Sequence, residues 1–228
     1  MMIRAFSIEK TMTDLLNTEV RLCDAADCCL AVRPPLVNPR NFRLFSSLLS
    51  LGRQYSFEEN HAIQVTSLAM MIFSKIADDH NFSDLDSDLL MSGAMLHDIG
   101  AGAKGHHKVS YQMIRRSSIS GLDDRQRFLA ALIARYHRKE EPSQNHAPYA
   151  SLPESDQKLV DKLSAILRIA DVLDRDHQQK LKSFEIEYDK DLLKIVLPPG
   201  IKNIIELKAF ENKSRLFERA FSRRVCLS

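Results

Sequence analysis

The stretch Leu96-His97-Asp98-Ile99-Gly100 places a histidine and an aspartate side by side at the end of an apolar run. Neutral imidazole and carboxylate together suit divalent first-row metals. On a helix, neighbouring side chains point about 100° apart, so the two groups approach one ion from different sides. Gly100-Ala101-Gly102 follows, where a helix is expected to stop. The pair therefore predicts a metal site at a helix end, where solvent can reach it.

The composition indicates an ordinary globular protein. The chain has 228 residues, of which 44% are hydrophobic and 27% are charged, and its net charge is +2. At this size roughly 70–75% of the surface of the unfolded chain can be buried, so the core does not need disulfides or metals for its stability. A balance this close to neutral gives no clear nucleic-acid signal. We find no apolar stretch long enough to cross a bilayer and no signal peptide, and therefore expect a cytoplasmic protein with no membrane contact.

The four cysteines do not form a disulfide framework. Three of them, Cys23, Cys28 and Cys29, crowd one segment, and Cys226 stands near the end of the chain. No Cys-x-x-Cys pair completes a zinc knuckle, so we expect reduced thiols.

Apolar residues recur at helical spacing along most of the chain. Helices are expected over residues 11–30, 41–51, 57–79, 85–96, 109–117, 124–137 and 154–176. Ser56 and Glu59 predict a capping box before the third of these helices, and Asp123 or Asp124 is expected to cap the sixth.

The pattern changes after residue 180. Residues 184–188 alternate with period two, residues 192–197 form a β-branched apolar run, and Asp189-Lys190-Asp191 between them is typical of a hairpin turn. A further helix is expected within residues 204–221 and a short strand over residues 224–227. We therefore expect a mainly α protein with a helical arm over residues 1–40, a helical metal-binding domain over 41–180, and a small α/β subdomain over 181–228.

Several histidines and aspartates fall at or near the expected helix ends, beside apolar stripes. A buried histidine or aspartate needs a partner, and a shared metal would satisfy all of them together. A lone histidine beside an apolar stripe is more often a hydrogen-bonded core residue, but an ordered set across five segments favours a metal. The set is His61, His97, Asp98, His106, His137 and Asp171, with His107 as an alternative to His106.

The order of these residues resembles that in the HD superfamily of metal-dependent phosphohydrolases. The local contexts at residues 96–100, 106–110, 134–139 and 166–175 are similar to the C-terminal HD domain of the exopolyphosphatase/guanosine pentaphosphatase family, and the likeness runs from about residue 41 to the end. It implies an HD-domain helical bundle followed by a small α/β cap made of a β-hairpin, a helix and a short strand.

The chain departs from the family pattern at several points. Val109 stands where family members often have a histidine, and Ala101 stands where many HD enzymes have a lysine. With only 7 glycines, the chain lacks the phosphate-binding glycine loops of the family's actin-like domain. We therefore expect the HD domain to stand alone, and the activity of the actin-like domain is not carried over.

The resemblance also implies roles for the residues. His61, His97, Asp98 and Asp171 would hold one divalent metal, and His106 and His137 a second, with Asp98 as the bridging and catalytic carboxylate. One or two ions fit, and the ligands do not distinguish manganese, iron, magnesium, zinc and cobalt. Asp174 is either a group that orients a ligand histidine or a solvated carboxylate at a helix end. The cations expected to bind substrate phosphates are Lys108, Arg138 and Arg175.

The implied function is hydrolysis of a phosphoester or phosphoanhydride by metal-activated water, with a nucleotide or polyphosphate-like substrate. Two alternatives stay open at this point. One is a non-catalytic regulatory module that binds polyphosphate or a nucleotide, and the other is an interaction protein with a vestigial site. A homodimer is compatible with the sequence.

Overall fold

The structure, a computed structural model, describes residues 39–201 and 205–228, with side chains from Phe42 onward. The expected helix at residues 11–30, the arm over residues 1–40 up to residue 38, and Cys23, Cys28 and Cys29 lie outside the described residues. Cys226 is a free, half-buried thiol in the last strand.

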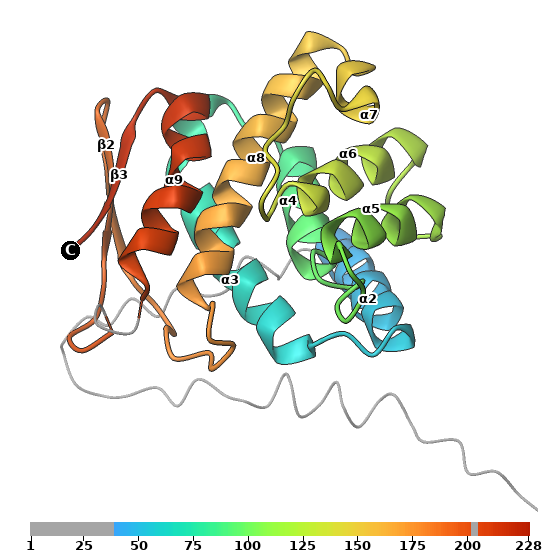
Figure 1. The fold of residues 1–228 in the computed structure, drawn as a ribbon, viewed down its shortest axis with the longest axis horizontal. Coiled ribbons are helices and arrows are strands. Elements are labelled where there is room, and N and C mark those ends of the chain that lie inside the picture. The colour runs from blue at the N-terminus through green and yellow to red at the C-terminus, as the bar shows by residue number, and fades with distance from the viewer. Residues whose placement is uncertain (1–38, 202–204) are drawn as a thin grey trace, which may run out of the picture. The chain divides into compact units, whose positions relative to one another are not determined.

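The described part is mainly helical and carries a small three-stranded sheet, as expected (Figure 1). The helices are α2 (Pro39–Gln54), α3 (Glu59–Ile76), the 3₁₀ helix η1 (Asp78–His80), α4 (Asp84–Met95), α5 (His106–Arg116), α6 (Asp124–Arg135), α7 (Ala147–Ala150), α8 (Glu154–Leu173) and α9 (Leu207–Phe221). The strands are β1 (Glu185–Tyr188), β2 (Leu192–Val196) and β3 (Arg224–Leu227). Within these ranges, none of the helices combines the length and the apolar character needed to cross a membrane.

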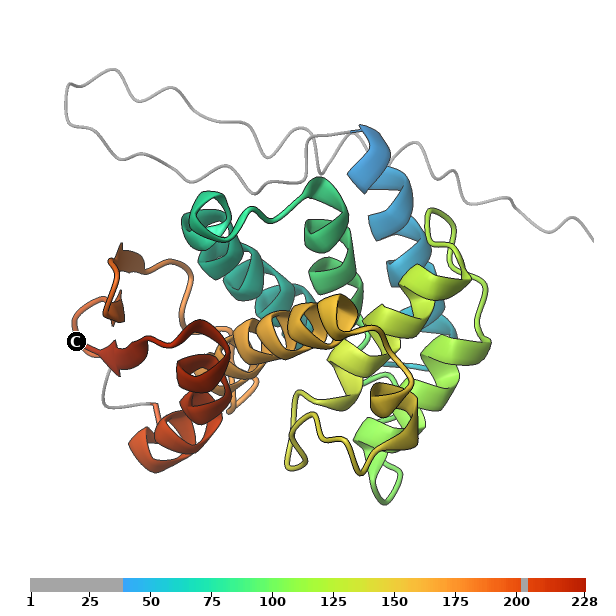
Figure 2. The ribbon, with the colours of Figure 1, turned by 90° about the horizontal axis from the view of Figure 1, so that it is seen from above.

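Helix α8 is the centre of the fold. It packs against α3, α4 and α6 and also against α9, and both views show it running through the middle of the helices (Figures 1 and 2). All residues from 163 to 170 are buried, so this part of the helix is covered all round. The apolar stripe predicted from the sequence is therefore only one side of a segment that is buried on all sides. Asp171 follows directly at the end of this segment.

Two helices begin at a side-chain capping box, whereas the start of a third differs from the prediction. Ser83 and Asp86 form a capping box at α4, and Asp123 caps α6 in the same way with Gln126. The box predicted from Ser56 is wrong, because Ser56 has a left-handed φ of 55° in a tight turn and α3 begins only at Glu59. The Glu59 carboxylate instead accepts two hydrogen bonds from Arg53, at 2.7 and 2.8 Å.

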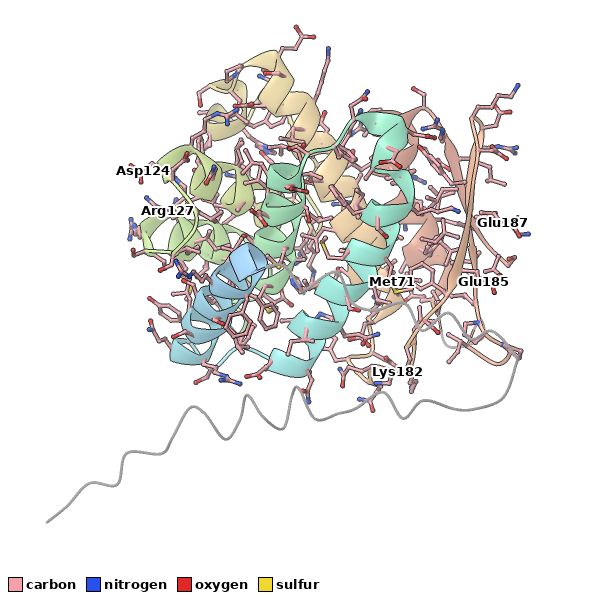
Figure 3. The ribbon with its side chains drawn as sticks, turned by 180° about the vertical axis from the view of Figure 1, so that it is seen from behind. Met71, Asp124, Arg127, Lys182, Glu185 and Glu187 are labelled. Atoms are coloured by element: carbon pink, nitrogen blue, oxygen red, sulfur yellow. The ribbon has the colours of Figure 1, made fainter. Side chains whose placement is uncertain are left out.

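The sheet confirms the predicted hairpin and last strand. β1 pairs with β2 in antiparallel fashion, with Ile186 opposite Ile195, and β2 pairs with β3 in parallel. The exposed side chains Glu185 and Glu187 lie on the outer side of β1 (Figure 3). The change from helix to strand falls between α8 and β1, as expected, whereas a subdomain boundary at residue 180 stays a prediction.

A polar cluster around His80 joins the sheet to the helices. The imidazole lies between Lys162 Nζ of α8, 3.4 Å from its Nδ1, and an Arg223 nitrogen, 2.7 Å from its Nε2. Tyr188 of β1 places its hydroxyl 2.5 Å from the same Nε2. Burial, together with the charges of Lys162 and Arg223, lowers the pKa of His80 to about 4, so the cluster holds a neutral imidazole.

This cluster predicts a pH dependence of stability. The pKa of a histidine is about 6.5 in an unfolded chain, so the folded state binds fewer protons than the unfolded state from pH 6.5 down to about 4. The free energy of unfolding therefore falls as the pH is lowered through this window. Thermal melts between pH 7.5 and 4.5 should show a smaller acid loss of Tm for His80→Asn than for the unchanged chain. Parallel Tm curves for the two proteins would contradict this assignment.

Candidate metal centre

Two helices deliver a histidine to the centre in the same way. His97 and His137 each stand two residues beyond the last residue of their helices, α4 and α6. Each Nδ1 contacts the backbone carbonyl three residues earlier, Ala94 at 2.7 Å and Ala134 at 2.6 Å. A carbonyl only accepts, so Nδ1 carries the proton and the Nε2 of the neutral ring is left as an acceptor. These contacts hold both rings in a fixed orientation at the ends of their helices.

Close packing of α4 and α6 brings these two histidines together. A Cβ at Gly93 would lie 2.6 Å from Cγ2 of Ile133, so the glycine allows the helices to approach. The rings of His97 and His137 consequently lie 4.9 Å apart, centroid to centroid.

His61, near the start of α3, is oriented by Asp174. Its Nδ1 lies 2.8 Å from Asp174 Oδ2, and both side chains are 1% exposed. The other Asp174 oxygen accepts a 2.7 Å hydrogen bond from the backbone N–H of Gln179. Burial therefore excludes the solvated alternative for Asp174, and this carboxylate fixes the direction in which His61 Nε2 points.

The six residues selected from the sequence form two groups, and Asp98 joins them. His61, His97 and Asp171 place their ligand atoms within 4.8 Å of one another, and Asp98, His106 and His137 do the same. Asp98 Oδ1 lies 3.3 Å from Nε2 of both His106 and His137, while its Oδ2 lies 3.7 Å from Nε2 of His97. The two oxygens of this carboxylate therefore point toward different histidines.

Between the two alternatives at the start of α5, the geometry selects His106. His106 offers a ligand atom within 4.8 Å of those of Asp98 and His137, and the group they form does not include His107, whose ring lies 6.0 Å from that of His106.

The electrostatics of the centre favour ionised carboxylates and a neutral His97. Burial lowers the pKa of His97 to about 4. Burial opposes ionisation of Asp98, but His97 and His137 outweigh it and lower its pKa. At Asp171, burial is likewise outweighed, by Lys213 and His61, and its pKa stays well below its usual range. At His61, burial is outweighed by the neighbouring carboxylates of Asp171 and Asp174, which raise its pKa to about 9.

This arrangement fits a bound cation. The lone pair of His97 Nε2 faces two carboxylate oxygens, one of Asp98 and one of Asp171, each 3.7 Å away. Three acceptors facing each other repel unless a positive charge lies among them. Nε2 of His61 and of His97 and Oδ1 of Asp98 are also buried without a hydrogen-bond partner among the described residues. Ligand atoms held about 2.1 Å from one ion in a tetrahedral arrangement would be about 3.4 Å apart, close to these separations.

Lys213 of α9 is a member of this centre that the sequence analysis missed. Its Nζ donates to Asp171 Oδ2 at 2.6 Å and to the carbonyl oxygen of His137. The lysine lies three residues after Phe210 and four before Phe217, both buried, and so on the apolar face of its helix. A lysine in the middle of an apolar stripe was the signal that could have identified it.

His177 covers one face of His61. The two rings stack with centroids 3.6 Å apart and an interplanar angle of 6°, and His177 Nδ1 lies 2.6 Å from Glu58 Oε2. His177 has a φ of 56°, in the left-handed region. This contact had no signal in the sequence, because His177 follows the long helix in a polar stretch.

The structure separates the three predicted phosphate-binding cations. An Arg138 nitrogen lies 3.4 Å from His106 Nε2, beside the centre. Lys108 pairs instead with Glu140 at 2.8 Å, and Arg175 pairs with Glu206 at 3.2 Å, both with more than half of their side chains exposed.

Residues 45–212 match the family model of the Ppx/GppA phosphatase, domain III. The matched range runs from α2 into α9 and contains all six residues of the two ligand groups.

Lys213→Met should destabilise the protein when no metal is bound. The change leaves the Asp171 carboxylate without its ammonium partner, and breaking a mostly buried ion pair of this kind costs about 3 kcal/mol. With chelator present, we expect the Tm to fall by about 6–12 °C, on a scale of about 2–4 °C per kcal/mol for a chain of this size. The matched control is Lys208→Met, an exposed lysine of the same helix. Equal Tm values for the two variants would contradict a role for Lys213 in the centre.

Proposed function

The chain belongs to the Ppx/GppA phosphatase family, and from this premise we propose that it is a metal-dependent phosphohydrolase. It would cleave a phosphoester or phosphoanhydride bond in a nucleotide or polyphosphate-like substrate. The observation that carries the proposal is the pair of ligand groups linked through the two oxygens of Asp98. A buried protein scaffold has no need for facing acceptors, since an apolar core of the same volume is at least as stable.

We propose two metal positions. His61, His97 and Asp171 would hold one ion, His106 and His137 the other, and Asp98 both. Bound divalent ions would supply Lewis acids that polarise a phosphoryl group and activate a water molecule. The residues of the chain then set the geometry, because Ala94, Ala134 and Asp174 fix the rings of His97, His137 and His61.

Cationic side chains would neutralise the substrate. Arg138, beside His106, is placed to hold a substrate phosphate, and its planar guanidinium matches two phosphate oxygens. Lys108 and Arg175 would have to exchange Glu140 and Glu206 for phosphate. Exposed ion pairs of this kind are worth about 0–1 kcal/mol, so a phosphate group can replace those carboxylates at small cost.

A non-catalytic binding module is the second candidate. It is favoured by the match to a single domain of a multi-domain phosphatase family. In that case nucleotide or polyphosphate would bind with a steep salt dependence and without turnover.

The experiment is a hydrolysis screen with aryl phosphate mono- and diesters, nucleotides and inorganic polyphosphate, each with manganese, iron, magnesium, zinc or cobalt. We expect Asp98→Asn to lower kcat/KM by more than about 100-fold, because loss of a ligand should exceed the 10–100-fold effect of losing a group that orients one. Asp84→Asn, at an exposed first-turn residue of α4, is the control and should retain activity.

Two results of this screen would overturn the proposal. Turnover that is equal in Asp98→Asn and in the unchanged chain would place the chemistry elsewhere. Binding of polyphosphate or nucleotide by the metal-loaded chain, with no hydrolysis of any substrate, would establish the binding module instead.

A further inference from the structure

A large groove lies between α2 and α5, lined by residues that take no part in the metal centre. Its volume is about 1150 Å³, above the usual 300–1000 Å³ of small-molecule pockets. Figure 1 shows the two helices next to each other. The α2 wall carries Arg43, Ser46, Ser50 and Gln54, spaced three to four residues apart along one helix face. A groove that follows one helix face in this way suits a chain-like ligand.

The charge of the groove favours an anion. Among residues 42–201 and 205–228, 15 line the groove and none of these is an aspartate or a glutamate, while Arg43 on α2 and Arg116 on α5 stand on its two walls. Both arginines are exposed, and neither forms an ion pair with a carboxylate in residues 42–201 or 205–228. The remaining polar lining consists of serines and glutamines, which donate hydrogen bonds to phosphate oxygens without adding negative charge.

Two exposed aromatic rings give the groove surfaces on which flat ligand groups can stack. Phe42 and Tyr55, each 49% exposed, both line it and are two of the four exposed large hydrophobic side chains in the described ranges. They stand thirteen positions apart, which corresponds to roughly 20 Å along a helix axis. A positive groove combined with exposed rings is the arrangement that binds single-stranded nucleic acid, because phosphates meet the cations and bases stack on the rings.

We propose that the α2–α5 groove binds single-stranded nucleic acid without sequence specificity. Arg43 and Arg116 would contact two phosphates, and Phe42 and Tyr55 would stack with bases near the two ends. At the roughly 3.4 Å rise of a stacked strand, the 20 Å between the rings spans about six nucleotides. The near-neutral total charge does not oppose this, since binding requires only a local basic surface.

The proposal does not depend on the phosphohydrolase activity. The groove shares no residue with the two ligand groups, so nucleic acid should bind equally well when metal is removed. Loss of metal-dependent turnover and loss of groove binding are therefore separate results.

The test is fluorescence anisotropy of the full chain with labelled oligo(dT) of 3, 6 and 12 nucleotides, in chelator, at several salt concentrations. We expect a Kd of about 10⁻⁴–10⁻⁶ M that stops improving near six nucleotides, and a slope of log K against log salt near −1.4, from about −0.7 per phosphate contact. Arg43→Gln should reduce the slope by about 0.7. Phe42→Ala should weaken binding roughly 5- to 100-fold, as expected for one lost base stack.

The control is Arg215→Gln, which removes an exposed arginine of α9 that does not line the groove. It should leave binding and slope unchanged. The proposal is overturned if no oligonucleotide binds, or if Arg215→Gln and Arg43→Gln weaken binding equally. If polyphosphate displaces the oligonucleotide and Phe42→Ala has no effect, the surface binds polyanions through charge alone, and this result would also overturn the proposal. So would sedimentation data in which Phe42→Ala dissolves a dimer, since the groove would then hold a second copy.

Discussion

The fold depends on how this protein stabilises acceptor atoms that face each other in its interior. His97 donates its only ring proton to the Ala94 carbonyl, so its Nε2 lone pair faces oxygens of Asp98 and Asp171. Helix ends, a central helix and a lysine all converge there. A cation among these atoms would convert a repulsive contact into an attractive one.

Distant parts of the chain meet at this point, and this explains the arrangement of the helices. Residues 163–170 of α8 are buried on all sides and lead directly to Asp171, where α8 packs against α3, α4 and α6. Helix α9 returns along α8 and inserts Lys213, which holds Asp171 Oδ2 and a carbonyl of the α6 end. The C-terminal part therefore contributes a residue to the centre as well as covering α8.

Most residues of the candidate metal centre could be predicted from the sequence. His97 and His137 follow apolar helical stretches, and Gly100-Ala101-Gly102 predicts the end of the first helix just beyond His97. Lys213 was missed because a lysine is normally read as solvated, although its stripe position marked it as buried. Ser56 was wrong as a cap because the local Ser-x-x-Glu pattern cannot show that Arg53 takes the Glu59 carboxylate. The choice between His106 and His107 required the direction of the α5 axis, which no local pattern contains.

The metal content per chain shows whether the facing acceptors hold cations. The protein would be purified without chelator and without a histidine tag, and analysed by elemental mass spectrometry beside Asp98→Asn. If facing acceptors in the core exist to hold cations, the unchanged chain should carry about two divalent metals, and loss of the shared carboxylate should reduce this to one or none. A well-folded chain with no metal, even after loading with each candidate ion, would contradict the account.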